Sequence, residues 1–228
     1  MARAAAFFDL DRTLLRRSSA LALAGPFRRR GLISRRQLVK AALWQLLFAA
    51  RGASHEAVRR AAEDGLVILR GMRPEEMRDL VAGALEELLR PLVYAEPLSL
   101  VERHRAHGEP AYVVSATLAE VVETIAADLG FDGALGTICE VGADGTYTGR
   151  AIRALHADAK ADAVRELAQT EGFDLDASWA YSDSHTDLPF LEAVGHPMVV
   201  NPDRRLRRIA AERGWPVLRF RERIPLAA

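Results

Sequence analysis

The sequence predicts an α/β fold in which a parallel sheet forms the core and a bundle of helices is inserted into it. Three short apolar runs end in acidic or hydroxyl side chains, near positions 9, 115 and 183, and each resembles a buried strand. Helical patterns separate these runs, as in parallel sheets. We therefore expect a core of residues 1–14 and 98–228 and a helical cap of residues 15–97. Ligands bind at the carboxyl edge of such sheets, so the strand ends should carry the site.

Composition narrows the class of protein. The 228 residues are half hydrophobic and have a formal net charge of zero, which argues against general nucleic-acid binding. The single Cys139 cannot form an internal disulfide, which fits a reducing compartment. Asp9 and Asp11 interrupt the first apolar stretch before a signal-peptide core could form. Residues 41–50 are nearly all apolar but could span only about half a bilayer. We expect a cytoplasmic protein without stable membrane insertion, and its oligomeric state stays open.

The first apolar run ends in two carboxylates and a hydroxyl. Asp9, Asp11 and Thr13 follow residues 4–8 at alternate positions. Side chains at i and i+2 of an extended segment point the same way, so Asp9 and Asp11 should face one site. Two like charges this close need a shared proton or a cation, and a hard divalent metal prefers oxygen ligands. Carboxylates at strand ends also cap helices or line loops, so this pattern alone leaves both roles open.

The second apolar run, residues 111–114, ends in Ser115 and Thr117, and a helical stretch from Leu118 is stopped by Gly130. Ser115 could be a plain helix cap, with Thr117 and Glu120 as variants of the same signal. Alternatively, the Ser115 hydroxyl and the free N–H groups of the helix start could bind an anion.

Lys160 stands out against the composition. The chain has 31 Lys plus Arg residues, but only Lys40 and Lys160 are lysines. A lysine kept in this background suggests a site that wants a compact point charge rather than a planar guanidinium. Lys160 lies where a helix should begin, and a solvated surface lysine is the alternative interpretation.

A third strand-like run, residues 179–182, ends in Asp183, with Asp187 four residues later. Both carboxylates could cap a helix around residues 189–194. They could also complete an oxygen-ligand metal site that Asp9 and Asp11 begin.

Together these pieces resemble the haloacid dehalogenase superfamily of phosphotransferases. Four motifs occur in the family's order along the whole chain: Asp9-Leu10-Asp11-Arg12-Thr13, Ser115-Ala116-Thr117, Lys160 and Asp183-Ser184-His185-Thr186-Asp187. The insert is similar to the helical cap of the subclass I (IB) branch that contains phosphoserine phosphatase. The resemblance implies a Rossmann-like core and a cap able to cover the site and exclude water.

The resemblance further implies a Mg²⁺-dependent phosphomonoester hydrolase. Asp9 would attack phosphorus to form an aspartyl-phosphate, and Asp11 would serve as general acid and then base. Mg²⁺ would bind a carboxylate oxygen of Asp9, the backbone carbonyl of Asp11 and Asp183, while Asp187 would join or orient this metal site.

The phosphate group would also need partners. The resemblance assigns Ser115 and Lys160 to the phosphoryl oxygens, with Lys160 also stabilising the charge of the intermediate. Thr13 would fix the loop at the phosphate site.

The chain departs in two places from the motifs of phosphoserine phosphatases, and this bears on the substrate. Phosphoserine phosphatases usually carry a Glu shortly after the first motif, where this chain has Arg16-Arg17-Ser18-Ser19, and their fourth motif is typically Gly-Asp-Gly-x-Asn-Asp, where this chain has Ser182-Asp183-Ser184-His185-Thr186-Asp187. These departures favour another small phosphorylated metabolite. A phosphotransferase with an acceptor other than water, or a lysophospholipid-type phosphatase, is the alternative.

The insert is basic, with 15 Arg plus Lys against 9 Asp plus Glu in residues 15–97. This fits a solvated helix surface, or a cap that attracts anionic substrates or an acidic membrane surface. The insert also places three apolar residues near three basic ones in the sequence: Trp44, Leu47 and Phe48 near Arg35, Arg36 and Lys40. This set would suit binding of an apolar-tailed phosphate, and it would suit the core of the cap equally well.

Two other classes of protein would explain part of this pattern. A signalling receiver also accepts phosphate on an Asp, but it needs no long helical insert here and its acidic residues lie on different strands. A catalytically inactive relative would not be expected to retain both Asp9 and Asp11.

The remaining patterns predict local structure. We expect helices over residues 34–50, 54–69, 74–89 and 203–214, and a hairpin over residues 135–150 that turns at Asp144-Gly145. His104 and His107 should share one exposed helix face, and His185 could approach the substrate.

Overall fold

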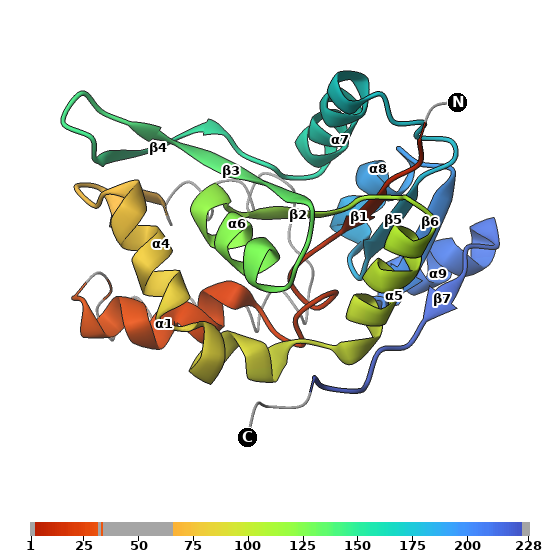
Figure 1. The fold of residues 1–228 in the computed structure, drawn as a ribbon, viewed down its shortest axis with the longest axis horizontal. Helices are drawn as coiled ribbons and strands as arrows, with labels where there is room; N and C mark the ends of the chain where they lie inside the picture. The colour runs from red at the N-terminus through yellow and green to blue at the C-terminus, as the bar shows by residue number, and fades with distance from the viewer. Residues whose placement is uncertain (1–2, 32, 34–65, 225–228) are drawn as a thin grey trace.

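The computed structural model describes residues 3–31, 33 and 66–224 (Figure 1). The helix predicted over residues 34–50 lies outside the described residues, and so does all but the end of the one predicted over 54–69. The same holds for the apolar and basic residues of the insert that we associated with an apolar-tailed phosphate: Arg35, Arg36, Lys40, Trp44, Leu47 and Phe48.

A seven-stranded sheet runs through the molecule in the order β4-β3-β2-β1-β5-β6-β7. All neighbouring strands pair in parallel except β3 and β4, which form an antiparallel hairpin. This confirms the predicted α/β class and the hairpin. The strands are β1 Ala6–Phe8, β2 Ala111–Leu118, β3 Gly133–Val141, β4 Tyr147–Arg153, β5 Trp179–Ser182, β6 His196–Val200 and β7 Val217–Leu218.

The end of β1 lies level with residues of the two strands beside it. Phe8, the last residue of β1, pairs with Val113 of β2 on one side and Tyr181 of β5 on the other. The polar residues that follow these positions therefore meet at one edge of the sheet. Each residue of β1 is fully buried, as expected for a parallel strand covered on both faces.

Helices cover both faces of this sheet (Figure 1). The strand residues alternate accordingly: Phe8 belongs to the hydrophobic cluster on the side of α5 and α6, and Phe7 to the cluster on the side of α7, α8 and α9. The helices of the described part are α1 Ser19–Arg29, α4 Pro74–Ala82, α5 Ala95–Ala106, α6 Ala119–Asp128, α7 Asp158–Glu171, α8 Leu188–Leu191 and α9 Arg204–Arg213.

The described part of the insert packs on the core rather than standing apart from it. Leu23 of α1 and Met77 and Val81 of α4 are buried in the same hydrophobic cluster as Phe8 and Val113 of the sheet. A bidentate ion pair also joins the insert to the core: the Arg90 guanidinium donates two hydrogen bonds to the Asp128 carboxylate of α6, each at 3.0 Å. The domain boundaries proposed from sequence stay a prediction.

Two helix predictions need correction. The helix expected over residues 74–89 ends at Ala82, and a separate π-helical turn, η2 Leu85–Leu89, follows it. Gly83 lies at the break, where a residue with high backbone freedom favours termination. Helix α6 begins at Ala119, so Ser115 lies within β2 and is not the helix cap.

The histidine prediction was also wrong. His104 is only 7% exposed on α5, and its ring is hydrogen-bonded to Glu109 and Tyr181, whereas His107 is exposed.

In the described residues, no helix has the length and apolar character needed to span a membrane.

Candidate active site

The site lies at the carboxyl edge of β1, β2 and β5. Asp9 directly follows β1, and its N–H donates to the carbonyl oxygen of Tyr181 at 2.9 Å. Ser115 lies in β2, and Asp183 directly follows β5. Each of these strands thus brings one of the predicted side chains to the same edge: Asp9 and Asp183 from the loops after β1 and β5, and Ser115 from within β2.

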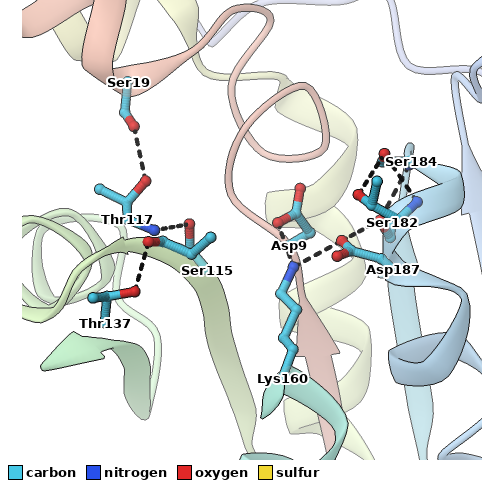
Figure 2. A network of polar contacts seen from close by, with 11 residues as sticks. Asp9, Ser19, Ser115, Thr117, Thr137, Lys160, Ser182, Ser184 and Asp187 are labelled. Carbon is cyan, nitrogen blue, oxygen red and sulfur yellow. Dashed lines mark hydrogen bonds and ion pairs between the residues drawn. The ribbon is translucent and has the colours of Figure 1, made fainter. Parts of the chain in front are cut away.

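Lys160 is the centre of the polar contacts (Figure 2). Its Nζ donates to Oδ1 of Asp9 at 2.7 Å and to Oδ2 of Asp187 at 2.8 Å. The Ser182 hydroxyl also donates to Oδ2 of Asp187, at 2.7 Å. Lys160 lies in the first turn of α7 and is only 2% exposed. The alternative of a solvated surface lysine is therefore excluded.

The carboxylates here carry perturbed pKa values. Burial raises the pKa of Asp9 to about 7; Lys160 opposes this rise, and the charge of Asp187 adds to it. Burial and the charges of Asp9 and Asp187 hold the pKa of Asp183 well above its usual range. For Lys160, burial lowers the pKa, but the charges of Asp187 and Asp9 outweigh burial and raise it. The ammonium group therefore stays charged.

The donor chemistry of the site fits a divalent cation. Asp9, Asp183 and Asp187 are all at least nine-tenths buried, and Lys160 is the one buried cation that bonds to them among the described residues. No described residue donates a hydrogen bond to the Asp183 carboxylate. Uncompensated buried carboxylates are costly, and oxygen ligands suit Mg²⁺. Still, no three His, Cys, Asp or Glu side chains of the described chain already stand in a metal-binding arrangement.

Asp11 points toward the start of α1. Its Oδ1 accepts a hydrogen bond from the backbone N–H of Ser19 at 2.7 Å. Burial raises the pKa of Asp11, and hydrogen bonds from Ser19 oppose that rise. The charge of Asp11 also adds to the rise in the pKa of Asp9. That Asp11 and Asp9 face the same site stays a prediction.

The end of β2 has its own hydroxyl network (Figure 2). Ser115 is 3% exposed, and its Oγ accepts from the N–H of Thr117 at 3.1 Å. Thr137 of β3 donates to the carbonyl oxygen of Ala116 at 2.7 Å, which fixes this stretch of backbone. Thr13 is fully buried, and its hydroxyl has no hydrogen-bond partner among the described residues.

Residues that sequence reasoning missed support the fourth motif. Asp203 accepts hydrogen bonds from both the N–H and Nδ1 of His185, each at 2.8 Å, so this histidine is held by Asp203. The N–H of Asp203 also donates to the carbonyl oxygen of Asp183 at 2.9 Å. The Asp203 carboxylate also caps α9 by accepting from the N–H of Leu206. An Asp at the start of a predicted helix was the signal in the sequence that could have identified this residue.

Asp187 precedes α8, but its carboxylate bonds to Lys160 and makes no cap bond.

Known proteins are similar in sequence to this chain along most of its length. Residues 6–192 match the family described as haloacid dehalogenase-like hydrolase. The chain is 44% identical over 229 residues to the "Inhibition of morphological differentiation protein" of Streptomyces azureus, covering 98% of this chain and 83% of that one. It is also 44% identical to a probable phosphatase of Mycobacterium tuberculosis, with 98% and 80% covered. A protein of the same organism named phosphoserine phosphatase is 38% identical, with 96% and 71% covered.

Solved structures share the fold. A protein of unknown function from Bordetella pertussis is 30% identical and superposes with a TM-score of 0.80 over 96% of this chain and 99% of that chain. A phosphoserine phosphatase carrying an analogue of a phospho-aspartyl intermediate is 16% identical and reaches a TM-score of 0.70, with 98% and 96% covered. At that identity the likeness concerns the fold alone.

Proposed function

The chain belongs to the haloacid dehalogenase-like hydrolase family, and from this premise we propose that it is a Mg²⁺-dependent phosphomonoester hydrolase acting through an aspartyl-phosphate. Phosphatase chemistry is the activity of this enzyme class, as the names of its relatives state. The observation that carries the finer proposal is the buried contact of Lys160 with Asp9 and Asp187 at the end of β1.

Asp9 is the proposed nucleophile. Its Oδ1 is bonded to Lys160, which fixes the carboxylate. In the first step, an Asp9 oxygen bonds to phosphorus as the bond from phosphorus to the leaving oxygen breaks, and Asp11 gives that oxygen its proton. In the second step, the Asp11 carboxylate takes a proton from water while the water oxygen bonds to phosphorus. The bond from phosphorus to Asp9 breaks, and inorganic phosphate leaves.

The phosphoryl oxygens need positive charge and hydrogen-bond donors. Lys160 supplies the charge, and as a buried ammonium group it acts with little screening. The Ser115 hydroxyl of β2 supplies a donor. The buried Thr13 hydroxyl is free to take a partner as far as the described residues go, and we propose that it contributes to the same phosphate site.

Mg²⁺ would be held by a carboxylate oxygen of Asp9, the backbone carbonyl of Asp11 and Asp183, with Asp187 joining or orienting the set. When bound, it supplies neutralisation of the charge between the nucleophile and the phosphate. The shortage of buried positive charge around Asp183 supports this proposal.

The proposed substrate is a small phosphorylated metabolite in the cytoplasm. The segment that carries a Glu in phosphoserine phosphatases reads Arg16-Arg17-Ser18-Ser19 here, and α1 has no acidic residue in its first turn. A substrate other than phosphoserine is therefore favoured. Transfer to an acceptor other than water would use the same residues, and a lysophospholipid-type substrate would make the rate depend on acyl-chain length.

Phosphate release from a panel of phosphomonoesters tests the proposal. We expect release in Mg²⁺, none in EDTA and none from Asp9→Asn, which changes one atom of the side chain and should fold. Phosphate release by a folded Asp9→Asn variant would contradict the nucleophile assignment. Release only after addition of an alcohol acceptor would instead assign the chain as a phosphotransferase.

A further inference from the structure

Ser19 connects the first helix of the insert to the loop that carries Asp11. It is the first residue of α1, it is fully buried, and its N–H donates to Oδ1 of Asp11 at 2.7 Å. The preceding residue, Ser18, stands at the N-cap position but makes no side-chain cap bond, and the first turn has no acidic residue. The carboxylate at the positive end of α1 is therefore that of Asp11.

The side chain of Ser19 reaches a second part of the site (Figure 2). Its Oγ lies 3.4 Å from Oγ1 of Thr117, and the N–H of Thr117 donates to Oγ of Ser115 at 3.1 Å. One buried residue thus contacts the loop of the proposed acid and base, and also the strand end that carries the proposed phosphate-binding hydroxyl.

We propose that Ser19 is a positioning residue for the reaction: its N–H orients the Asp11 carboxyl toward the leaving oxygen, and its hydroxyl holds the strand end that carries Ser115. This inference rests on the proposed function. A carboxyl group on a loop can rotate, and a proton donor works only within hydrogen-bond reach of the leaving oxygen. A bond to a helix N–H removes that rotation. The alternative is that Asp11 merely caps α1.

Ser19→Pro removes the N–H while keeping the helix start. Proline is favoured at the first position of a helix, where the N–H has no intrahelical partner. The residue before a proline must be extended, and Ser18 already has φ −63° and ψ 129°. Ser19→Ala is the comparison, because it removes the hydroxyl and keeps the N–H.

Two substrates separate positioning from a general structural effect. A nitrophenolate leaves without needing a proton, whereas the alkoxide of an alkyl phosphate needs one from Asp11. The quantity to compare is kcat/KM, since it reports the phosphoryl transfer to Asp9. We expect Ser19→Pro to lower kcat/KM about 10- to 100-fold for glycerol phosphate and by no more than about threefold for nitrophenyl phosphate. In Ser19→Ala the ratio of the two substrates should change by no more than about threefold.

Ser18→Pro is the matched control, because the φ of Ser18 already suits proline and its N–H makes no hydrogen bond within the described residues. We expect wild-type values for both substrates. An equal loss for both substrates in a folded Ser19→Pro variant would overturn the positioning role while leaving the proposed function intact. A wild-type protein inactive on both esters would instead overturn the proposed function.

The contact between the Ser19 and Thr117 hydroxyls has its own test. It decides whether Ser19 is a positioning residue if Ser19→Pro does not fold. Ser19→Ala and Thr117→Val each remove one hydroxyl of the pair. We expect each to raise the inhibition constant of inorganic phosphate severalfold, with the double variant no weaker than the worse single variant. Independent, multiplying effects, or none, would overturn the proposal.

Discussion

The Nζ of Lys160 lies 2.7 Å from Oδ1 of Asp9, although 151 residues separate them in the chain. The contact joins the end of β1 to the first turn of α7, and Asp187 completes it from the start of α8. A buried lysine between two carboxylates is expensive to desolvate, and removing one member of such a set leaves uncompensated charge. The contact therefore has consequences both for activity and for stability.

Replacing the lysine tests both consequences. We expect Lys160→Met to lower kcat/KM by about 100- to 1,000-fold, because a preorganised charge at the phosphoryl group is lost. The free energy of unfolding at pH 8 without metal should fall by about 3–5 kcal/mol. Lys160→Arg keeps the charge but needs more room than the buried site offers, so it should not restore activity. A Lys160→Met enzyme with wild-type kcat/KM would contradict the role of this residue.

The pKa of Asp9 predicts how pH changes the stability of the metal-free protein. Burial raises that pKa from 3.8 to about 7 in the folded state, so between these values the folded protein binds more protons than the unfolded one. Stability from this group is therefore present at low pH and is lost as the pH rises through about 7. In EDTA, the Tm of the wild type should fall relative to that of Asp9→Asn between pH 5 and pH 8. Parallel Tm curves would contradict the raised pKa.

The ends of β1 and β5 were predictable from the sequence because each combines a local apolar run with a following polar residue, Asp9 and Asp183. The end of β2 was not, because this strand continues past its apolar run to Leu118, and Ser115 therefore lies inside it. Lys160 was predictable from its rarity, and its position at a helix start was correct. None of these inferences needed knowledge of contacts between distant residues.

Side-chain partners were not predictable, because they depend on such contacts. The spacing of Asp9 and Asp11 gives no sign that Asp11 bonds to the N–H of Ser19. Helical periodicity likewise could not tell that His104 faces the sheet, where its partner Tyr181 is 77 residues away. The antiparallel hairpin was local, and its prediction was correct.

Metal binding can be measured without turnover. Mg²⁺ should raise the Tm at pH 8, corresponding to about 2–3 kcal/mol when its concentration is about 100 times the dissociation constant. Asp183→Asn should lose most of this gain, because the substitution removes a proposed ligand. Asp144→Asn is the control, since Asp144 is an exposed residue of the β3–β4 turn that bonds to Thr146. An equal Mg²⁺ effect in Asp183→Asn and the wild type would contradict the metal assignment.

His104 predicts a stability effect separate from catalysis. Its Nε2 lies 2.8 Å from the Tyr181 hydroxyl and its Nδ1 lies 2.7 Å from Oε2 of Glu109, while the Tyr181 ring stacks on Phe8 with 4.2 Å between centroids. Tyr181→Phe keeps the stacking but leaves a buried ring nitrogen of His104 without its partner. We expect the free energy of unfolding to fall by about 1–3 kcal/mol.

Tyr112→Phe on β2, the strand on the other side of β1, is the matched control, because the Tyr112 hydroxyl makes no hydrogen bond within the described residues. Its effect should stay within about 0.5 kcal/mol in denaturant unfolding. The Tyr181→Phe enzyme should keep its kcat/KM within about threefold, since its ring still supports Phe8 and hence the position of Asp9. Equal unfolding curves for the two variants would show that the Tyr181 hydroxyl contributes nothing to stability. A large loss of kcat/KM in Tyr181→Phe alone would mean that this buried cluster also positions the nucleophile.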